Sequence, residues 1–232
     1  MRVILVAVTT APFQRARSAE SKRRRSQDLI DAARGLALEN GVASLTLVAI
    51  AQRAGVHHSA VRRYFGSHKE VLLHLAADGW IRWSHAVRDA LHGRQTDARR
   101  LAEVLATTLA ADPLFCDLLA HVPLHLEHEI DVERVIDFKR QTREPITAMV
   151  DAIAAAAPYL DARAAGDLVL ATDALAATLW QVAHPAPSLA AARQRDPDLS
   201  AIDVSDFTST LLRLLTATCI GLAPRDQPPF AG

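Results

Sequence analysis

The chain has 232 residues, enough for one large domain or two small ones with a buried core. Half of the residues are hydrophobic, 22% are charged and only 5% are aromatic, which excludes a disordered chain and favours helices over a β-sandwich or barrel. Two cysteines exclude a disulfide framework, and no apolar run reaches the about 18–20 residues of a membrane span, so we expect a cytoplasmic protein that does not enter a membrane.

The formal net charge of zero conceals an uneven distribution along the chain. Residues 15–70 contain eleven Lys and Arg against five Asp and Glu, a net charge of +6, whereas residues 71–232 contain fourteen against twenty-one, a net charge of −7. A basic N-terminal segment on an acidic remainder indicates that this segment meets a polyanion. Taken alone, the run KRRR at 22–25 is also compatible with a solvated helix end.

The first seventy residues contain the signals of several short helices. After a disordered or loosely docked basic extension at 1–20, apolar residues at helical spacing predict a helix over 21–39, and Asn40-Gly41 supplies a left-handed stop. A second helix is expected over 46–53, with the Thr46 hydroxyl as its cap, and a third over 58–64. Ser67 and Glu70 have the spacing of a capping box that opens a long helix to about residue 91.

The remainder of the chain also has helical periodicity. We expect helices over 98–110, 113–129, 132–157 with a kink at Pro145, 162–183 and 204–222. No repeat and no alternating strand pattern is found. The sequence therefore predicts an all-α protein, with a three-helix N-terminal domain at 21–75 and a helical C-terminal domain at 76–232.

The second and third helices have the layout of a helix-turn-helix. Gly55 permits the reversal between them, and Val61 and Phe65 are expected in the core. The third helix then presents hydroxyl, imidazole and guanidinium donors suited to base edges in the major groove. The predicted DNA-binding residues are His57, His58, Ser59, Arg62 and Arg63 for the bases, Thr46, Tyr64 and Lys69 for phosphates, and Lys22 and Arg23 of the basic run.

These residues resemble the tetracycline-repressor (TetR) family of bacterial transcriptional regulators. The similarity lies in DLIDAA at 28–33, ENG at 39–41, LT at 45–46, IAQRAGV at 50–56 and RYFGSHKE at 63–70. It implies an N-terminal DNA-binding domain, a helical effector-binding domain, a homodimer paired through its last two long helices, and repression that a small molecule relieves. In the recognition helix, HHSAVR at 57–62 departs from the common SKGTLY, so the operator sequence cannot be transferred from relatives. The regions 113–119, 126–129 and 185–208 resemble one subgroup more loosely.

Large side chains of the predicted C-terminal helices are candidate walls of an effector cavity. The predicted ligand-binding residues are Trp80, Trp83, Phe115, Leu119, Met149 and Trp180, with His121 and His125 as polar handles. Plain core packing is the alternative for each of them. The expected effector is a largely apolar small molecule.

Apolar stripes on the last two long helices are the predicted dimer interface, because two recognition helices are needed to bind a palindromic operator. The stripes consist of Leu168, Leu175 and Leu179 on one helix and Phe207, Leu211, Leu214 and Leu215 on the other.

Two other classes of function stay open. His121, His125 and His128 share one helix face and could bind a metal, but Pro123 disturbs that helix, and we expect neither a metal nor another cofactor. The unusual recognition helix also leaves open an adaptor that does not bind DNA. No catalytic motif is found, and an enzyme is not expected.

Overall fold

The computed structural model describes residues 11–126, 130–199, 204 and 206–224. Within these ranges the chain is helical and contains no strand. The elements are α1 (Ala11–Asn40), η1 (Val42–Ser44), α2 (Leu47–Arg53), α3 (His58–Val61), α4 (His68–Leu91), α5 (Ala98–Ala110), α6 (Pro113–His121), η2 (Val122–Leu126), α7 (Val132–Ala156), α8 (Ala162–Ala183), α9 (Pro187–Arg195), η3 (Pro197–Leu199) and α10 (Phe207–Leu222).

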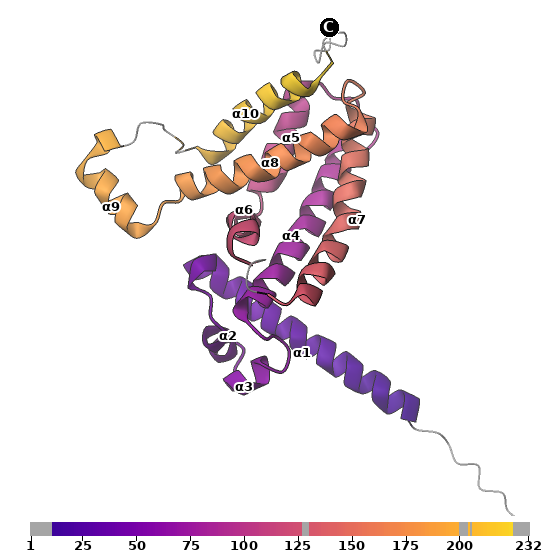
Figure 1. The fold of residues 1–232 in the computed structure, drawn as a ribbon, viewed down its shortest axis with the longest axis vertical. Coiled ribbons are helices and arrows are strands. Elements are labelled where there is room, and N and C mark those ends of the chain that lie inside the picture. The colour runs from indigo at the N-terminus through magenta and orange to yellow at the C-terminus, as the bar shows by residue number, and fades with distance from the viewer. Residues whose placement is uncertain (1–10, 127–129, 200–203, 205, 225–232) are drawn as a thin grey trace, which may run out of the picture.

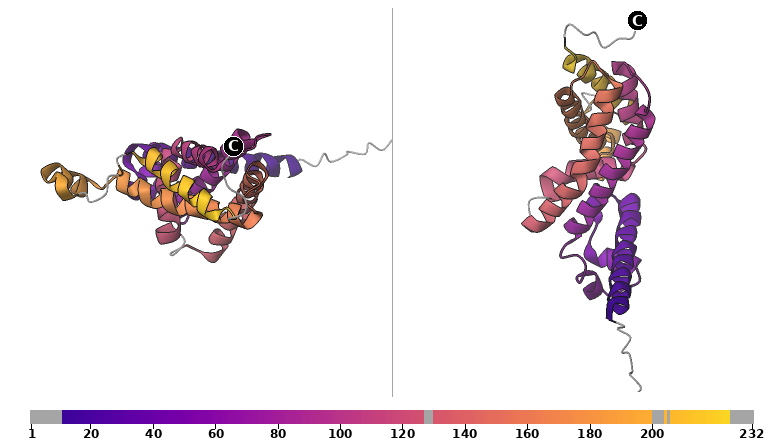
Figure 2. Two further views of the ribbon diagram at one scale, coloured as in Figure 1. Left: turned by 90° about the horizontal axis from the view of Figure 1, so that it is seen from above. Right: turned by 90° about the vertical axis from the view of Figure 1, so that its right-hand side faces the viewer.

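Helix α4 joins two packed parts of the molecule. Its N-terminal half completes a head with α1, α2 and α3, and its C-terminal half lies beside α7 in a helical body (Figure 1). In the body, α8 packs against α6 and α10, and α10 also packs against α5. The head lies at one end of the long axis and α10 lies near the other (Figure 1), as the right-hand view of Figure 2 also shows.

Side-chain caps fix where most of these helices begin. Thr46 Oγ1 accepts a hydrogen bond from the Ala49 N–H at 3.1 Å, and Ser67 Oγ accepts one from the Glu70 N–H at 3.3 Å. Aspartates cap α5, α6, α8 and α10 in the same way. Each cap satisfies an N–H group that has no partner within its own helix.

Several predicted boundaries need correction. Residues 11–20, expected to be part of a loose extension, form the first turns of α1, while residues 1–10 lie outside the described ranges. The predicted helix over 113–129 is α-helical only to His121 and continues as the π-helical turn η2, which contains Pro123. Proline has no N–H to continue the α-helical ladder, which accounts for the change. The prediction also missed α9, which lies beyond proline residues and projects from the body (Figure 1).

The body is organised around an aromatic cluster. Trp80 and Trp83 of α4 contact the Phe115 ring of α6, with ring centroids 5.4 and 6.3 Å apart. Phe115 is fully buried, and it lies so close to α4 that a Cβ atom at Gly79 would be 2.1 Å from its ring. In the described part of the chain no single helix has the length and apolarity of a membrane span; α5 and α6 meet that standard only when counted together, and they are bent by 92°.

Candidate functional site

The exposed side of α3 is the first candidate site. Gly55 has φ +65°, the left-handed conformation expected at the turn, and Val61 and Phe65 are buried beneath the helix. His57, His58, Ser59, Arg62 and Arg63 are exposed to solvent. The predicted recognition side chains therefore all face outward. The α-helix is shorter than predicted, since it ends at Val61 and continues as turns.

His57 supplies the cap of α3 in place of the serine that is common in the TetR family. Its Nδ1 accepts a hydrogen bond from the Ser59 N–H at 3.4 Å and lies 2.9 Å from Ser59 Oγ. The His57 and His58 rings also lie 4.5 Å apart. The departure at position 57 therefore keeps a cap.

The predicted phosphate contacts surround this helix. Thr46 is exposed at the start of α2, and Tyr64 and Lys69 are partly exposed on either side of the turn into α4. Lys22 and Arg23 are exposed on α1. These side chains can donate hydrogen bonds, as phosphate contacts require.

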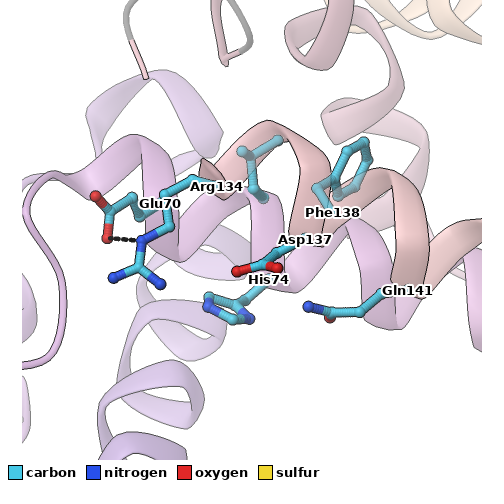
Figure 3. Close-up of a pocket in the computed structure, with 7 residues that line it drawn as sticks. Glu70, His74, Arg134, Asp137, Phe138 and Gln141 are labelled. Carbon is cyan, nitrogen blue, oxygen red and sulfur yellow. Dashed lines mark ion pairs between the residues drawn. The ribbon is translucent and has the colours of Figure 1, made fainter. Parts of the chain in front are cut away.

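A charged cluster connects the start of α4 to α7. Glu70 Oε2 accepts a hydrogen bond from the Gly66 N–H at 3.1 Å and lies 3.7 Å from Arg134 Nε (Figure 3). His74 lies one turn further along α4 beside this pair, and burial lowers its pKa despite nearby carboxylates. The same glutamate thus contacts both the turn after α3 and the first part of α7.

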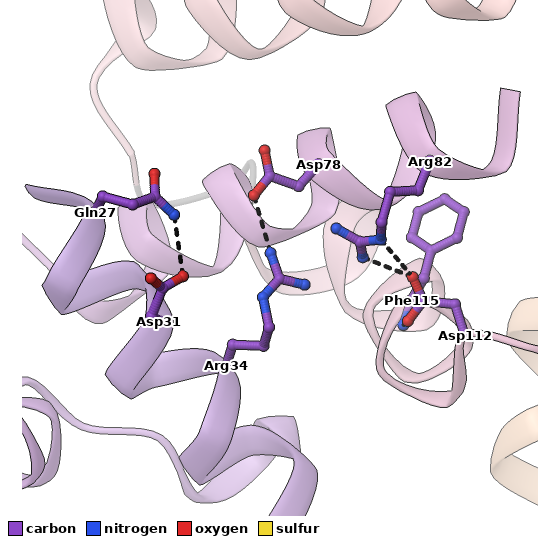
Figure 4. Close-up of polar contacts among 7 residues, drawn as sticks. All are labelled: Gln27, Asp31, Arg34, Asp78, Arg82, Asp112 and Phe115. Atoms are coloured by element: carbon purple, nitrogen blue, oxygen red, sulfur yellow. Dashed lines mark hydrogen bonds and ion pairs between the residues drawn. The ribbon is translucent and has the colours of Figure 1, made fainter. Parts of the chain in front are cut away.

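Two further ion pairs fix α4 to helices on either side of its midpoint (Figure 4). Arg34 of α1 lies 3.0 Å from Asp78 of α4, and Arg82 of α4 lies 2.6 Å from Asp112, the cap of α6. Because α4 takes part in both pairs, a shift of this helix would displace the head relative to α6.

Asp117 of α6 connects the body to the head, and the sequence did not indicate this contact. Its Oδ2 accepts a hydrogen bond from the Val42 N–H at 3.0 Å, and its Oδ1 accepts one from Gln181 Nε2 at 2.8 Å. His121 Nε2 lies 3.7 Å away. Burial would raise the pKa of Asp117, but the contacts with His121, Val42 and Gln181 together lower it. One ionised carboxylate therefore joins the head, α6 and α8.

A cavity of about 340 Å³ lies between α4, η2, α6, α7 and α8. Most of its wall is apolar, and Lys139, Thr142 and Asp173 contribute the polar groups. The lining residues are Trp80, Leu119, Val122, Pro123, Phe138, Lys139, Thr142, Ile146, Val150, Gly166, Val169, Leu170 and Asp173. Its size and mixed lining suit a small organic ligand.

Of the predicted ligand-binding residues, Trp80 and Leu119 line this cavity. Phe115 and Met149 are fully buried in the core. Trp83 donates a hydrogen bond to Thr108 at 3.1 Å and faces a different hollow.

Trp180 and His121 of that set do not line the cavity. Trp180 stacks on His184, with ring centroids 3.9 Å apart, and contacts Phe207. His121 lies beside Asp117, and the side chain of His125 lies outside the described residues.

The structure places most of the predicted dimer residues in the core of one protomer. Leu168, Leu211 and Leu215 are fully buried within one protomer, and Leu179 and Phe207 are 9% and 7% exposed. They are core residues, whereas Leu175 and Leu214 remain partly exposed. An amphipathic stripe identifies the buried face of a helix but not whether its own chain or a second copy covers that face.

The structure offers no support for a metal site within its described ranges, where no group of three potential ligands is close enough to hold an ion. His128 and the side chain of His125 lie outside these ranges.

Comparison with known proteins identifies both parts of the chain. Residues 29–75 match the model of "Bacterial regulatory proteins, tetR family", and residues 77–226 match "Tetracyclin repressor-like, C-terminal domain". A search of the curated proteins finds no match.

Several solved structures share the fold. A TetR transcriptional regulator from Rhodococcus sp. RHA1 is 20% identical with a TM-score of 0.53, over 88% of this chain and 99% of that one. Thermus thermophilus FadR, a transcriptional repressor in complex with lauroyl-CoA, is 20% identical with a TM-score of 0.53, over 89% and 100%. The multidrug binding protein EbrR, complexed with imidazole, is 21% identical with a TM-score of 0.51, over 86% and 95%. At these identities the likeness shows the fold alone, but the family models cover the head and the body, and the chain belongs to the TetR family of DNA-binding transcriptional regulators.

Proposed function

We propose that this regulator is a cytoplasmic homodimer that represses transcription by holding a palindromic operator through two copies of α3. A small molecule that occupies the cavity beside α4 releases the repressor from the operator. The single observation that carries the proposal is that α4 both follows the recognition helix and contributes Trp80 to the cavity wall. A ligand in that cavity therefore contacts the helix that carries the head.

The chemistry of the head supports DNA as its partner. Arg62 and Arg63 are exposed, and an arginine can donate two hydrogen bonds to the edge of a guanine. His58 and Ser59 add shorter donors and acceptors on the same side. The net charge of +6 over residues 15–70 supplies a phosphate-binding term that weakens as salt rises.

The contacts between head and body support a mechanism for release. Phe138 lines both the effector cavity and the small hollow that contains Glu70 and Arg134. A ligand that displaces Phe138 would also move the first turns of α7, and with them Arg134, the ion-pair partner of Glu70. The two heads of a dimer would then no longer match the spacing of two half-sites.

The test is operator binding by an Arg62→Ala, Arg63→Ala double variant. Fluorescence anisotropy with the DNA upstream of the chain's own gene, at near-physiological salt with excess competitor, measures the specific affinity. Each lost base contact is worth about 1–3 kcal/mol, so we expect an affinity at least about tenfold weaker with an unchanged melting temperature.

A matched control removes two charges from the far end of the body. Arg99→Ala with Arg163→Ala leaves α3 intact, and both side chains are exposed. We expect this control to bind the operator like the wild type. Equal loss in the two double variants would mean that net charge alone, and not α3, carries binding, and no specific binding by the wild type would favour the adaptor.

A further inference from the structure

One carboxylate lines the effector cavity, and the surrounding residues offset its negative charge only in part. Asp173 of α8 lies on the wall of the cavity, and burial raises its pKa to about 6. Lys139 of α7 acts in the opposite direction, but its side chain is exposed to solvent. Its ammonium lies 5.3 Å from the centroid of the Phe138 ring, and solvent screens its effect on the more buried acid. Asp173 is therefore the polar group of this cavity that gains most from a new partner.

The apolar surroundings of Asp173 restrict what that partner is. Trp80 and Phe138 contribute aromatic rings to the same cavity, and Val169 and Leu170 flank the carboxylate on its own helix. Aromatic faces attract cations, and an apolar wall favours a hydrocarbon body. A ligand with a carboxylate would instead bring a second negative charge into the cavity with Asp173.

We propose that the effector is an amphipathic amine, whose hydrocarbon part fills the cavity and whose protonated nitrogen forms an ion pair with Asp173. This inference rests on the proposed function, because it names the class of molecule that the regulator senses. Asp173 selects the positive charge, and the apolar lining provides most of the contact area. Lys139 weakens the binding of such a ligand through repulsion.

The experiment compares three probes that share an eight-carbon chain and differ only in the head group. Octylamine, 1-octanol and octanoate are titrated into the full-length protein by isothermal calorimetry at pH 7.5. We expect octylamine to bind about tenfold more tightly than 1-octanol, which corresponds to about 1.4 kcal/mol, and octanoate to bind most weakly. Tightest binding by octanoate, or no detectable binding of octylamine, overturns the proposal.

Variants assign the preference to particular side chains. Asp173→Asn should remove the advantage of octylamine while leaving the affinity for 1-octanol within about twofold, a change small beside the expected tenfold preference. Lys139→Met should tighten octylamine binding. An octylamine preference that survives in Asp173→Asn means that another group selects the amine, and it overturns the proposal. Wild-type protein that binds octanoate more tightly than octylamine, and loses that binding in Lys139→Met, has an anion site and also overturns the proposal.

The pH dependence gives a second readout. Octylamine stays charged between pH 5 and 8, so its affinity should fall below about pH 6 as Asp173 becomes protonated, and should stay flat in Asp173→Asn. A wild-type affinity that does not change over this range contradicts the ion pair. Circular dichroism confirms that the variant is folded.

Operator binding by the same samples separates the two proposals. Specific DNA binding without any octylamine binding rejects the ligand class and leaves the DNA-binding role of the proposed function intact. Octylamine binding by a protein without operator affinity rejects the proposed function and retains the site.

Discussion

Gly79 is a position where a single methyl group would disturb the contact between α4 and α6. A Cβ atom there would lie 2.1 Å from Cδ2 of Phe115, whose ring is fully buried between Trp80 and Trp83. Such a ring cannot move away without displacing its neighbours, because protein interiors are close-packed. Glycine is therefore required at this position for packing, and not for an unusual backbone conformation.

We expect Gly79→Ala to lower the free energy of unfolding. Overpacking of this kind typically costs about 1–3 kcal/mol, which exceeds the about 0.5–1 kcal/mol that alanine gains over glycine within a helix. Thermal and urea unfolding followed by circular dichroism measure the change.

The matched control is Gly166→Ala in α8, where a Cβ atom would meet nothing within 4 Å. This variant should be at least as stable as the wild type. Phe115→Leu in the Gly79→Ala background should recover part of the loss. Equal melting temperatures for the two alanine variants would show that the contact between α4 and α6 relaxes freely.

Local signals made some residue roles predictable and left others hidden. Thr46 and Ser67 can be recognised as caps from the sequence alone. A hydroxyl before an amphipathic run accepts a hydrogen bond from an N–H only three residues away. Gly79 and Asp117 carry no such signal. The partner of Asp117 in the head lies 75 residues away in the chain, and a contact of that kind exists only once the helices have packed.

At the scale of helices, the hydrophobic periodicity of the sequence predicted the helices that have one buried face. It missed α9, which has no buried face. The predicted range over 98–110 coincides with α5, whose leucines and alanines are buried along one side. Helix α9 buries no residue, so it has no stripe of apolar residues for a periodic pattern to reveal. Pro187 occupies the first turn of α9, a position that proline tolerates.

Asp117 allows a test of how helices α6 and α8 hold the head. Asp117→Ala leaves the Val42 N–H and the Gln181 amide without their acceptor. Of the two, only the Val42 N–H belongs to a buried residue, and an unsatisfied buried group costs about 1–3 kcal/mol. We expect both a lower stability and an operator affinity about tenfold weaker, since the head loses a fixed orientation. Fluorescence anisotropy with operators whose half-sites are moved apart in single base-pair steps provides the measurement.

The spacing series separates an effect on orientation from an effect on stability alone. The wild type should prefer one half-site spacing, and Asp117→Ala should tolerate several. Gln181→Ala, which removes only the bond to α8, should be intermediate. A uniform loss of affinity at every spacing would assign Asp117 a purely structural role.

At the scale of the whole molecule, the unpaired faces of α8 and α10 differ from the predicted stripes. These helices lie against each other at one side of the body (Figure 1), and Leu211 and Leu215 lie within the protomer. The outward face of α8 contains the exposed small residue Ala174, and that of α10 contains Ala217 and Ile220, which is 39% exposed. Periodicity located both helices but could not distinguish these two faces, since each contains apolar residues.

We therefore expect the outward face, and not the predicted stripes, to hold the dimer together. Ala174→Arg with Ala217→Arg places a charge on each helix at an exposed position, where a free protomer tolerates it. An unpaired charge in an apolar contact is costly, so the dimer should dissociate at concentrations where the wild type stays dimeric. A single head then meets only one half-site, and specific operator binding should be lost.

Analytical ultracentrifugation measures the assembly. The control is Ala155→Arg at an exposed position of α7, and this variant should stay dimeric. Leu211→Ala, by contrast, should lower the free energy of unfolding by about 2–5 kcal/mol through a cavity in the core. A double arginine variant that stays dimeric and binds the operator would move the interface to another surface of the body.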